Sequence, residues 1–386
     1  MIKKLLIANR GEIAIRIAEA AAELGIATVA VHSQDDANSL HTRRTDEVQA
    51  LKGRGAAAYL DIAGVIEAAK AAKCDAVHPG YGFLSENAEF ARACAKAKIR
   101  FVGPTPEQLA LFGDKAAARA QAIRCKVPVL PGTDGAVDAA GAVAFFRKNA
   151  KAGIALKAIA GGGGRGMRLI RKEDEIADAF ARASAEALSA FGNGALYAER
   201  LVSKARHIEI QIVGDGKGGV AALGERECTL QRRSQKIVEL APSPNLPEVL
   251  RKKIVAAAVT MAKSVSYRSL GTFEFLVEDN EFFFIEANPR LQVEHTVTEE
   301  VWGVDLVQAQ LKGVLPDIQG PRGAAIQLRI NMETMTADGS AKPGGGTLTV
   351  FEPPSGPGVR VDTYGYAGYR TNPNFDSLLE IGRAHV

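Results

Sequence analysis

The chain has 386 residues, of which 47% are hydrophobic and 24% charged, so it is long enough for two or three packed domains. Its 48 basic and 44 acidic residues give a net charge of +4 without a polybasic run, which argues against nucleic acid or an anionic membrane as a partner. No apolar stretch is long enough for a transmembrane helix or a secretory signal, and the four cysteines form no CxxC pair. We therefore expect a cytoplasmic protein in a reducing compartment.

Residues 1 to about 105 alternate between apolar strands and alanine-rich helices. The expected strands are KKLLIAN, ATVAVHS, DAVHPGYG and RFVGP, and the expected helices end at Leu24 or run over residues 61–73 and 87–97. This rhythm predicts a parallel, doubly wound sheet. No GxGxxG follows the first strand, so a dinucleotide site is not supported. Asn9 to Glu12 could still line a ligand crevice where that strand passes into a helix.

The rest of the chain reads as a mixture of helices and alternating strands. Helices are expected over residues 104–131, 172–191, 247–266 and 298–314. The expected strands are IALKAIA, GMRLI, ALYAERLV, RHIEIQIVGD, AAIQLRIN, GTLTVFEP and VRVDTYG, and LQRRSQKIVE is expected to be a polar loop. We therefore predict an α/β and α+β protein with an N-terminal domain over residues 1–112, a central domain over 113–318 and a β-rich domain over 319–379.

The stretch that begins with GTFEFLV predicts a β-hairpin, because GTFEFLV and EFFFIEA are rich in aromatic and β-branched residues and flank turn-forming residues. With a three-residue loop over Asp279 to Glu281, Glu278 would lie opposite Phe282. The same register would place Glu274 opposite Glu286. Two opposed carboxylates destabilise a sheet unless something neutralises them.

A divalent cation held by oxygen ligands would neutralise this pair, and Mg²⁺ fits best. Asn288 would lie on the same face of the sheet as the two carboxylates. The polar residues that follow directly are Arg290, Gln292 and Glu294. A solvent-facing acidic hairpin is the alternative, and these further polar residues argue against it.

A run of glycines between two strands, Gly161 to Gly166, is expected to bind phosphate, because backbone N–H groups can approach phosphate oxygens closely there. The run is not a P-loop, since it lacks GK[ST] and precedes a strand; a flexible hairpin tip is the alternative. Lys157 lies in the apolar strand before the glycines, where a lysine needs an anionic partner. Together with the acidic hairpin, these features predict binding of Mg²⁺ and a nucleoside triphosphate.

These motifs stand in the order found in biotin carboxylases, and the chain resembles that family over residues 1 to about 379. The motifs that carry the resemblance are MIKKLLIANRGEIAIRI, HPGYGFLSEN, FVGP, GDK, GGGGRGMR, RHIEIQI, ERECTLQRRSQK, GTFEFL and FIEANPRLQVEHTVTE. The resemblance implies an ATP-grasp central domain between N- and C-terminal biotin carboxylase domains. It also implies ATP-dependent carboxylation of biotin by bicarbonate through carboxyphosphate, the first half-reaction of acetyl-CoA and other acyl-CoA-type carboxylases, with Mg²⁺ or Mn²⁺ as the metal.

The resemblance also assigns roles to individual residues. The implied nucleotide contacts are Lys115, Lys157, Gly163, Gly164, Glu199, Arg200, Leu201, Val202, His207, Gln231, Glu274 and Glu286. The implied metal ligands are Glu274, Glu286 and Asn288, and the implied bicarbonate contacts are Lys236, Arg290, Gln292 and Val293. Glu294 matches the general base that deprotonates bicarbonate, and Arg329 matches the arginine that stabilises the biotin enolate. Without the resemblance, His207 would be interpreted as a strand-edge residue and Arg329 as part of a structural ion pair.

The chain departs from the family pattern in three places. Ser234 stands where histidine is common near the phosphates, and Arg200 stands where lysine is common in the adenine hinge. After NFDSLL the family pattern stops, and we expect Glu380 to Val386 to be an artefactual tail on a truncated C-terminal domain. Strands near residues 347–379 would then lose partners, so we predict that the chain as written aggregates and is weakly active.

Two other interpretations remain open at this point: another ATP-grasp ligase of the carbamoyl-phosphate type, which would not need RLQVEH and LRIN together, and an inert ATP-binding fragment. No methionine precedes a lysine, so biotin has to arrive on another chain or on a downstream domain. The expected partners are therefore bicarbonate, a biotin carboxyl carrier domain and a carboxyltransferase, and the family implies a homodimer when the chain is complete. The sequence does not give the acyl acceptor, because the carboxyltransferase selects it.

Overall fold

The computed structural model describes residues 2–159, 166–202, 204–232, 235–337 and 340–385. Its N-terminal part contains a parallel five-stranded sheet in the order β3-β2-β1-β4-β5. The elements here are β1 (Lys4–Ile7), α1 (Gly11–Glu23), β2 (Ala27–His32), η1 (Leu40–Arg43), β3 (Glu47–Ala50), α2 (Gly55–Tyr59), α3 (Ile62–Ala71), β4 (Ala76–His78), α4 (Ala88–Lys96) and β5 (Arg100–Phe101). Leu5 and Ile7 pack with α1 on one face of the sheet, whereas Leu6 packs with α3 and α4 on the other. The predicted doubly wound arrangement is therefore confirmed.

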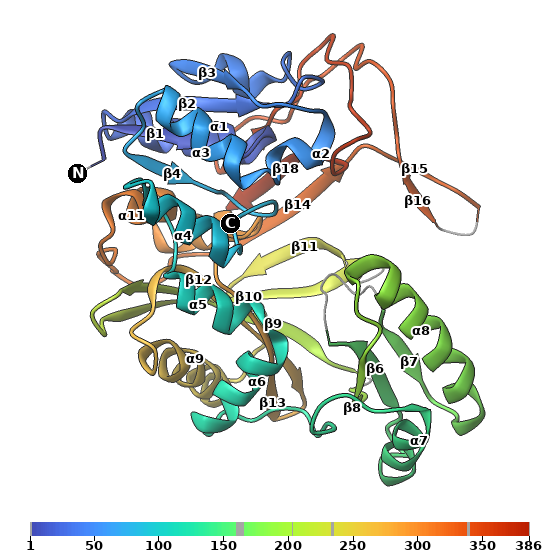
Figure 1. Ribbon diagram of the computed structural model, residues 1–386. Coiled ribbons are helices and arrows are strands. Elements are labelled where there is room, and N and C mark those ends of the chain that lie inside the picture. Colours follow the sequence, from blue (N-terminus) through green and yellow to red (C-terminus); the bar gives the residue numbers. More distant parts are fainter. Residues whose placement is uncertain (1, 160–165, 203, 233–234, 338–339, 386) are drawn as a thin grey trace.

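An antiparallel eight-stranded sheet occupies the centre of the molecule (Figure 1). Its strands, in spatial order, are β13 (Glu281–Asn288), β12 (Arg268–Glu278), β9 (Arg206–Asp215), β10 (Val220–Arg232), β11 (Gln235–Ala241), β14 (Ala325–Asn331), β18 (Leu378–His385) and β17 (Val359–Thr363). On β9, Ile208, Ile210 and Ile212 pack in a buried core with α9 (Glu248–Lys263). Because side chains alternate along a strand, the opposite face of β9 carries polar residues. That polar face holds the candidate site.

A three-stranded sheet in the order β7-β6-β8 lies to one side of the central sheet, as Figure 1 shows. Its strands are β6 (Ile154–Ala158), β7 (Arg168–Ile170) and β8 (Leu196–Arg200), and α7 (Ala139–Lys148), η2 (Glu173–Glu175) and α8 (Ile176–Phe191) pack beside it. Helix α8 ends at Gly192, whose positive φ of 71° suits glycine, as predicted. Residues 160–165, which include Gly163 and Gly164 of the glycine run, and Ser234 lie outside the described residues.

The remaining helices connect these sheets. They are α5 (Pro106–Gly113), α6 (Lys115–Arg124), α10 (His295–Trp302) and α11 (Leu306–Lys312). The single helix expected over residues 298–314 is wrong, because Gly303 adopts a left-handed φ of 61° that ends α10. Asp305 then caps α11 by accepting a hydrogen bond from the backbone N–H of Gln308. No helix among the described residues has both the length and the apolar character to cross a bilayer.

Two expectations about strands are wrong: one segment expected to be a loop forms strands, and one expected strand does not form. The described residues of LQRRSQKIVE are strand and not loop, because residues 230–232 belong to β10 and residues 235–239 to β11, with Gln231 opposite Lys236. Gln231, Gln235 and Lys236 line a cavity instead of a core, so an apolar pattern could not reveal the strands. GTLTVFEP forms no strand in the part of the chain that the structure describes, and Thr347 makes an isolated bridge to Arg370. The short pair β15 (Glu333–Met335) and β16 (Ala341–Pro343) precedes it.

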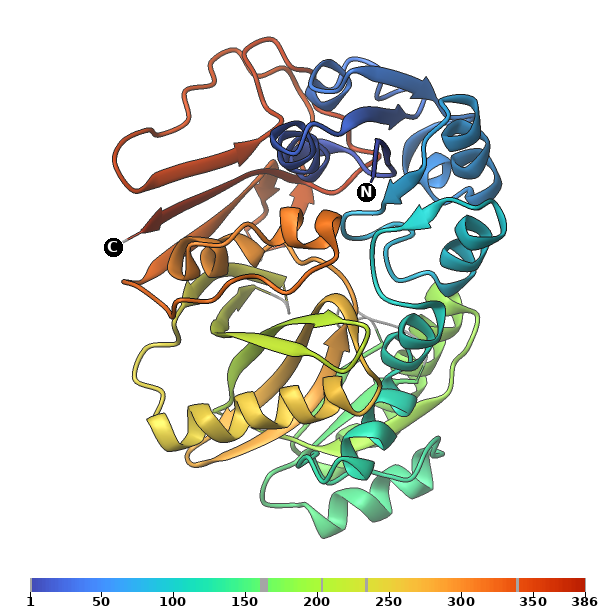
Figure 2. The same cartoon turned by 90° about the vertical axis from the view of Figure 1, so that its left-hand side faces the viewer.

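The C-terminal residues belong to the central sheet. Strand β18 pairs with β14 on one side and with β17 on the other, and α1 lies against β17 and β18 (Figure 2). The fully buried Arg383 forms ion pairs with Glu300 at 3.0 Å and Asp362 at 2.6 Å. Residues 380–385, expected to be a tail, therefore have partners on both sides, and their artefactual origin stays a prediction.

Candidate active site

The β12–β13 hairpin places two carboxylates opposite each other, although its loop differs from the expected one. The loop is one residue shorter, so Glu278 pairs with Glu281 and not with Phe282. A bulge in β13 then shifts the register by one residue, and Glu274 lies opposite Glu286. The expected loop is therefore wrong, whereas the expected opposition of the two carboxylates is confirmed.

Strand pairing extends this pair into a row of charged residues across four strands. Glu274 on β12 lies opposite Glu209 on β9, and Glu209 lies opposite Arg226 on β10. Neither Glu209 nor Arg226 was among the predicted site residues. The signal for Glu209 was present in RHIEIQIVGD, where polar residues alternate with the isoleucines. Three adjacent carboxylates repel one another, so the row needs cations.

Lys236 on β11 neutralises the middle of this row. Its Nζ lies 2.6 Å from Glu209, 3.1 Å from Glu274 and 2.6 Å from Glu294. Burial lowers the pKa of Lys236, but the three carboxylates outweigh it and hold that pKa well above its ordinary value. Lys236 is therefore a permanent cation in the floor of the site.

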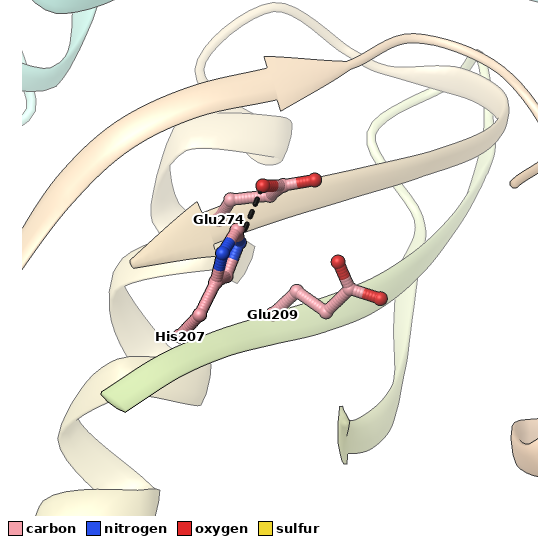
Figure 3. Close-up of side chains that lie close together, drawn as sticks. All are labelled: His207, Glu209 and Glu274. Atoms are coloured by element: carbon pink, nitrogen blue, oxygen red, sulfur yellow. Dashed lines mark hydrogen bonds and ion pairs between the residues drawn. The ribbon is translucent and has the colours of Figure 1, made fainter. Parts of the chain in front are cut away.

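His207 is a second partner of Glu274. His207 and Glu209 project from β9, and Glu274 projects from the neighbouring β12 (Figure 3). Nε2 of His207 lies 2.5 Å from Oε2 of Glu274, and burial opposes but does not cancel the resulting rise in the pKa of His207. Potential metal-ligand atoms of these three residues lie within 4.8 Å of one another. Because Lys236 already bridges the two carboxylates, the group is satisfied as an ion-pair network.

The two lysines expected to contact nucleotide are also paired with carboxylates. Lys115, at the start of α6, lies 2.7 Å from Glu286. Lys157 on β6 lies 2.5 Å from Glu199 on β8, so it has the anionic partner that its apolar strand requires. Arg200 stacks on an aromatic ring instead, with its guanidinium carbon 5.3 Å from the centre of Phe283.

Glu294 is held between two cations at the start of α10. Its Oε1 lies 2.6 Å from Lys236, and its Oε2 lies 3.0 Å from Arg329. Burial would raise the pKa of Glu294, but Lys236, Arg329 and Arg226 together lower it well below its usual range. Arg329 also pairs with Glu239 at 2.5 Å, a buried group that the sequence did not reveal and whose pKa burial raises to about 7. Glu294 is therefore ionised at physiological pH.

A cavity of about 850 Å³ lies over this network. Residues far apart in the sequence line it together, among them Asn9, Arg10 and Glu12 and residues 374–378. The predicted site residues that line it are Lys115, His207, Gln231, Lys236, Glu274, Glu286, Asn288, Arg290, Gln292, Val293, Glu294 and Arg329. The predicted residues that lie apart, on β6, on β8 or directly after β8, are Lys157, Glu199, Arg200, Leu201 and Val202.

The donor atoms at the hairpin suit a hard divalent cation, because carboxylate and amide oxygens are its preferred ligands. Nδ2 of Asn288 donates to Glu274 at 2.6 Å, which places the amide beside the carboxylate. Oδ1 of Asn288 accepts from Arg290 at 3.1 Å. A metal bound to Oε2 of Glu286 would have to exchange with Lys115, whose Nζ lies 2.7 Å from that oxygen.

Three family models match consecutive parts of the chain: the biotin carboxylase N-terminal domain over residues 1–109, the carbamoyl-phosphate synthase L chain ATP-binding domain over 114–315, and the biotin carboxylase C-terminal domain over 327–381. The biotin carboxylase of Nostoc sp. is 46% identical over 97% of this chain and 86% of its own length. The chain belongs to the biotin carboxylase family. The expected family and its ATP-grasp fold are confirmed, and biotin carboxylase domains on both sides of the ATP-binding domain disfavour a carbamoyl-phosphate ligase.

Longer carboxylases contain the same module. The pyruvate carboxylase of Bacillus subtilis is 48% identical over 98% of this chain, and this chain spans 34% of that protein. The chain therefore spans about a third of the pyruvate carboxylases that it matches. The biotin carboxylase domain dimer of the Hydrogenobacter thermophilus 2-oxoglutarate carboxylase, solved with MgADP, ADP and bicarbonate, has a TM-score of 0.94 at 39% identity, covering 100% of this chain and 86% of that chain. Biotin carboxylases are ligases, so the expectation of an enzyme is confirmed.

Proposed function

We propose that this protein uses ATP and bicarbonate to carboxylate N1′ of biotin, with carboxyphosphate as the intermediate. The observation that carries the proposal is the position of Glu294 between Lys236 and Arg329 at the cavity. One site then contains Glu294 as the base, Lys236 as the cation for bicarbonate and Arg329 as the cation for the biotin enolate.

The nucleotide would bind at the hairpin end of the cavity. Lys115 and Lys157 neutralise phosphate oxygens, and both exchange a carboxylate partner for the phosphate when they do so. Glu274 and Glu286, with Asn288 beside them, would hold Mg²⁺. When bound, the metal neutralises charge on the phosphate groups.

Bicarbonate would bind next to the general base. Lys236, Arg290, Gln292 and the backbone of Val293 form its proposed pocket. Glu294 takes the proton of bicarbonate, although a carboxylate with a strongly lowered pKa is a weak base. Bicarbonate that draws Lys236 toward itself raises the basicity of Glu294, because the carboxylate then loses part of its nearest positive charge.

Biotin would enter from the Arg329 side, carried by a biotin carboxyl carrier domain that also visits a carboxyltransferase. We further propose a cytoplasmic location and a homodimer. By their names, the relatives act on pyruvate and 2-oxoglutarate although their biotin carboxylase modules are similar to this chain. The acceptor is therefore a property of the carboxyltransferase, and acetyl-CoA with fatty acid synthesis is one option among these.

The test is ADP release by the purified chain, measured with and without bicarbonate and with and without free biotin. Biotin carboxylation predicts release that needs bicarbonate and rises with biotin. Release that needs bicarbonate but ignores biotin would support a carbamoyl-phosphate-type ligase instead. Binding of ATP without turnover would identify an inert fragment.

A further inference from the structure

Arg226 on β10 is the bulkiest fully buried side chain among the described residues, and it lies beneath the cavity without lining it. Its guanidinium donates five hydrogen bonds: Nε to Glu209 (2.5 Å), Nη1 to Gln211 (2.7 Å) and Thr298 (2.9 Å), and Nη2 to Thr272 (3.1 Å) and Gln292 (2.8 Å). An arginine has five N–H groups, so every donor is used. The plane of the guanidinium is thereby fixed from β9, β12, α10 and the loop before α10.

The contact with Gln292 reaches the proposed bicarbonate pocket. Arginine can only donate, so Gln292 has to turn its Oε1 toward Arg226. This orientation leaves Nε2 of Gln292 to donate to Glu274, 3.0 Å away. Without Arg226, Oε1 of Gln292 would lose its buried donor, and Glu274 would hold the amide through Nε2 alone. Arg226 therefore fixes the other end of the amide, so that Nε2 of Gln292 stays in place at this point of the cavity.

The contact with Glu209 acts on the charge of Lys236. One oxygen of Glu209 accepts from Arg226, and the other lies 2.6 Å from Nζ of Lys236. Both Arg226 and Glu209 are fully buried, so their charges are weakly screened by solvent. Without Arg226, Lys236 would be the remaining cation paired with Glu209. The net charge below the proposed anion pocket would then be more negative.

We propose that Arg226 is a positioning residue for bicarbonate: it orients the amide of Gln292 and offsets the charge of Glu209, so that Lys236 can attract the anion. This inference rests on the proposed function, because bicarbonate is the ligand that Gln292 and Lys236 would bind. Arg226 touches neither of the nucleotide lysines, so ATP binding is expected to change little.

Two substitutions separate the charge of Arg226 from its geometry. Arg226→Met removes the charge and all five donors, whereas Arg226→Lys keeps the charge with three donors and no planar fork. We expect the KM for bicarbonate to rise about 30-fold or more in Arg226→Met and about tenfold in Arg226→Lys. The KM for ATP should stay within about threefold of the wild-type value in both variants. Arg251→Met is the matched control, because Arg251 pairs with Glu225, the neighbour of Arg226 on β10, and does not line the cavity.

A double substitution distinguishes positioning from mere stabilisation. Glu209→Gln combined with Arg226→Met removes both charges of the buried pair, so thermal stability should recover relative to Arg226→Met. The KM for bicarbonate should remain raised, because Gln292 still lacks its donor. Recovery of both the stability and the KM would show that Arg226 has only a structural role. If Arg226→Met does not fold, Arg226→Lys and the double variant decide the question.

The inference is overturned if the wild type releases ADP in response to bicarbonate and the Arg226 variants keep the bicarbonate KM within about twofold. It is also overturned if the KM values for ATP and bicarbonate rise in equal proportion. A wild type without bicarbonate-dependent ADP release would contradict the proposed function instead. In that case, line broadening of ¹³C-bicarbonate by the wild type and by Arg226→Lys tests Arg226 directly; equal broadening, or none with the wild type, rejects its role.

Discussion

Glu294 shows how a single residue depends on its neighbours for its chemistry. Glu294→Gln keeps the shape of the side chain but removes the basic carboxylate, and its single oxygen can accept from only one of Lys236 and Arg329. General-base catalysis contributes roughly 10²- to 10⁴-fold to rate, so we expect bicarbonate-dependent ADP release to fall by about that factor. ATP affinity should be retained, and Glu248→Gln in an exposed ion pair on α9 should leave turnover unchanged. Undiminished turnover in Glu294→Gln would exclude it as the base.

Glu12 on α1 is a buried carboxyl group whose Oε1 has no hydrogen-bond partner among the described residues. Burial raises its pKa from about 4.5 to about 8, and Arg10 only partly opposes this rise. The folded state therefore binds this proton more tightly than the unfolded state does. It follows that folding stability falls as the pH rises from about 4.5 to about 8.

Replacing Glu12 tests this reasoning. Glu12→Gln should remove this part of the pH dependence and stabilise the fold by roughly 2–4 kcal/mol at pH 8, with a smaller gain at pH 6. Thermal unfolding between pH 6 and pH 8.5 measures the effect. Glu19→Gln, on an exposed position of the same helix, serves as the control. Parallel pH profiles for the wild type and Glu12→Gln would contradict the assignment.

At the site, the sequence predicted pairs within one hairpin but not contacts between distant strands. The opposition of Glu274 and Glu286 was expected from alternation, but it holds because a bulge in β13 offsets the shorter loop, and no local pattern predicted either feature. Glu209 and Arg226 join that row only through sheet pairing, which no local pattern specifies. Lys236, the lysine that pairs with Glu274, lies on β11 in a segment that was expected to be a loop.

At the scale of elements, the predictions succeeded where an apolar periodicity marked a buried face. The N-terminal sheet, α8 and the β12–β13 hairpin all have such a face. The adjoining ends of β10 and β11 were missed, because Gln231, Gln235 and Lys236 are polar and line the cavity. The break between α10 and α11 depends on Gly303, whose left-handed backbone is not visible in a helical pattern.

Strand β18 offers a test at this scale. Arg383→Met removes a fully buried cation between Glu300 and Asp362. Breaking a buried ion pair from one side costs about 3–5 kcal/mol, and we expect a loss of roughly 2–4 kcal/mol here because Glu300 is partly exposed. Urea unfolding measures the loss, and Arg147→Met in an exposed pair should cost little. A neutral Arg383→Met would mean that residues 380–385 contribute nothing to the folded sheet.

At the scale of the whole molecule, the cavity joins three parts of the chain, and the two carboxylates proposed to hold the metal, Glu274 and Glu286, are each paired with a lysine. We therefore expect Mn²⁺ alone to bind weakly and to bind at least about tenfold more tightly together with an ATP analogue, because the phosphates draw Lys115 away from Glu286. Electron paramagnetic resonance of free Mn²⁺ measures both affinities. Lys115→Met should strengthen binding of the metal alone and weaken binding of the metal–nucleotide complex, whereas the exposed Lys252→Met should change neither. Equal Mn²⁺ affinity with and without nucleotide would contradict this exchange.

The cavity wall also has a consequence for synthesis of the protein. Asn9 to Glu12 and residues 374–378 face the same cavity although almost the whole chain separates them in sequence. During translation the first group leaves the ribosome long before the second exists, so the N-terminal sheet can fold early while the cavity stays open on one side. A nascent chain should therefore not complete this cavity until residues 374–378 have been synthesised and have docked.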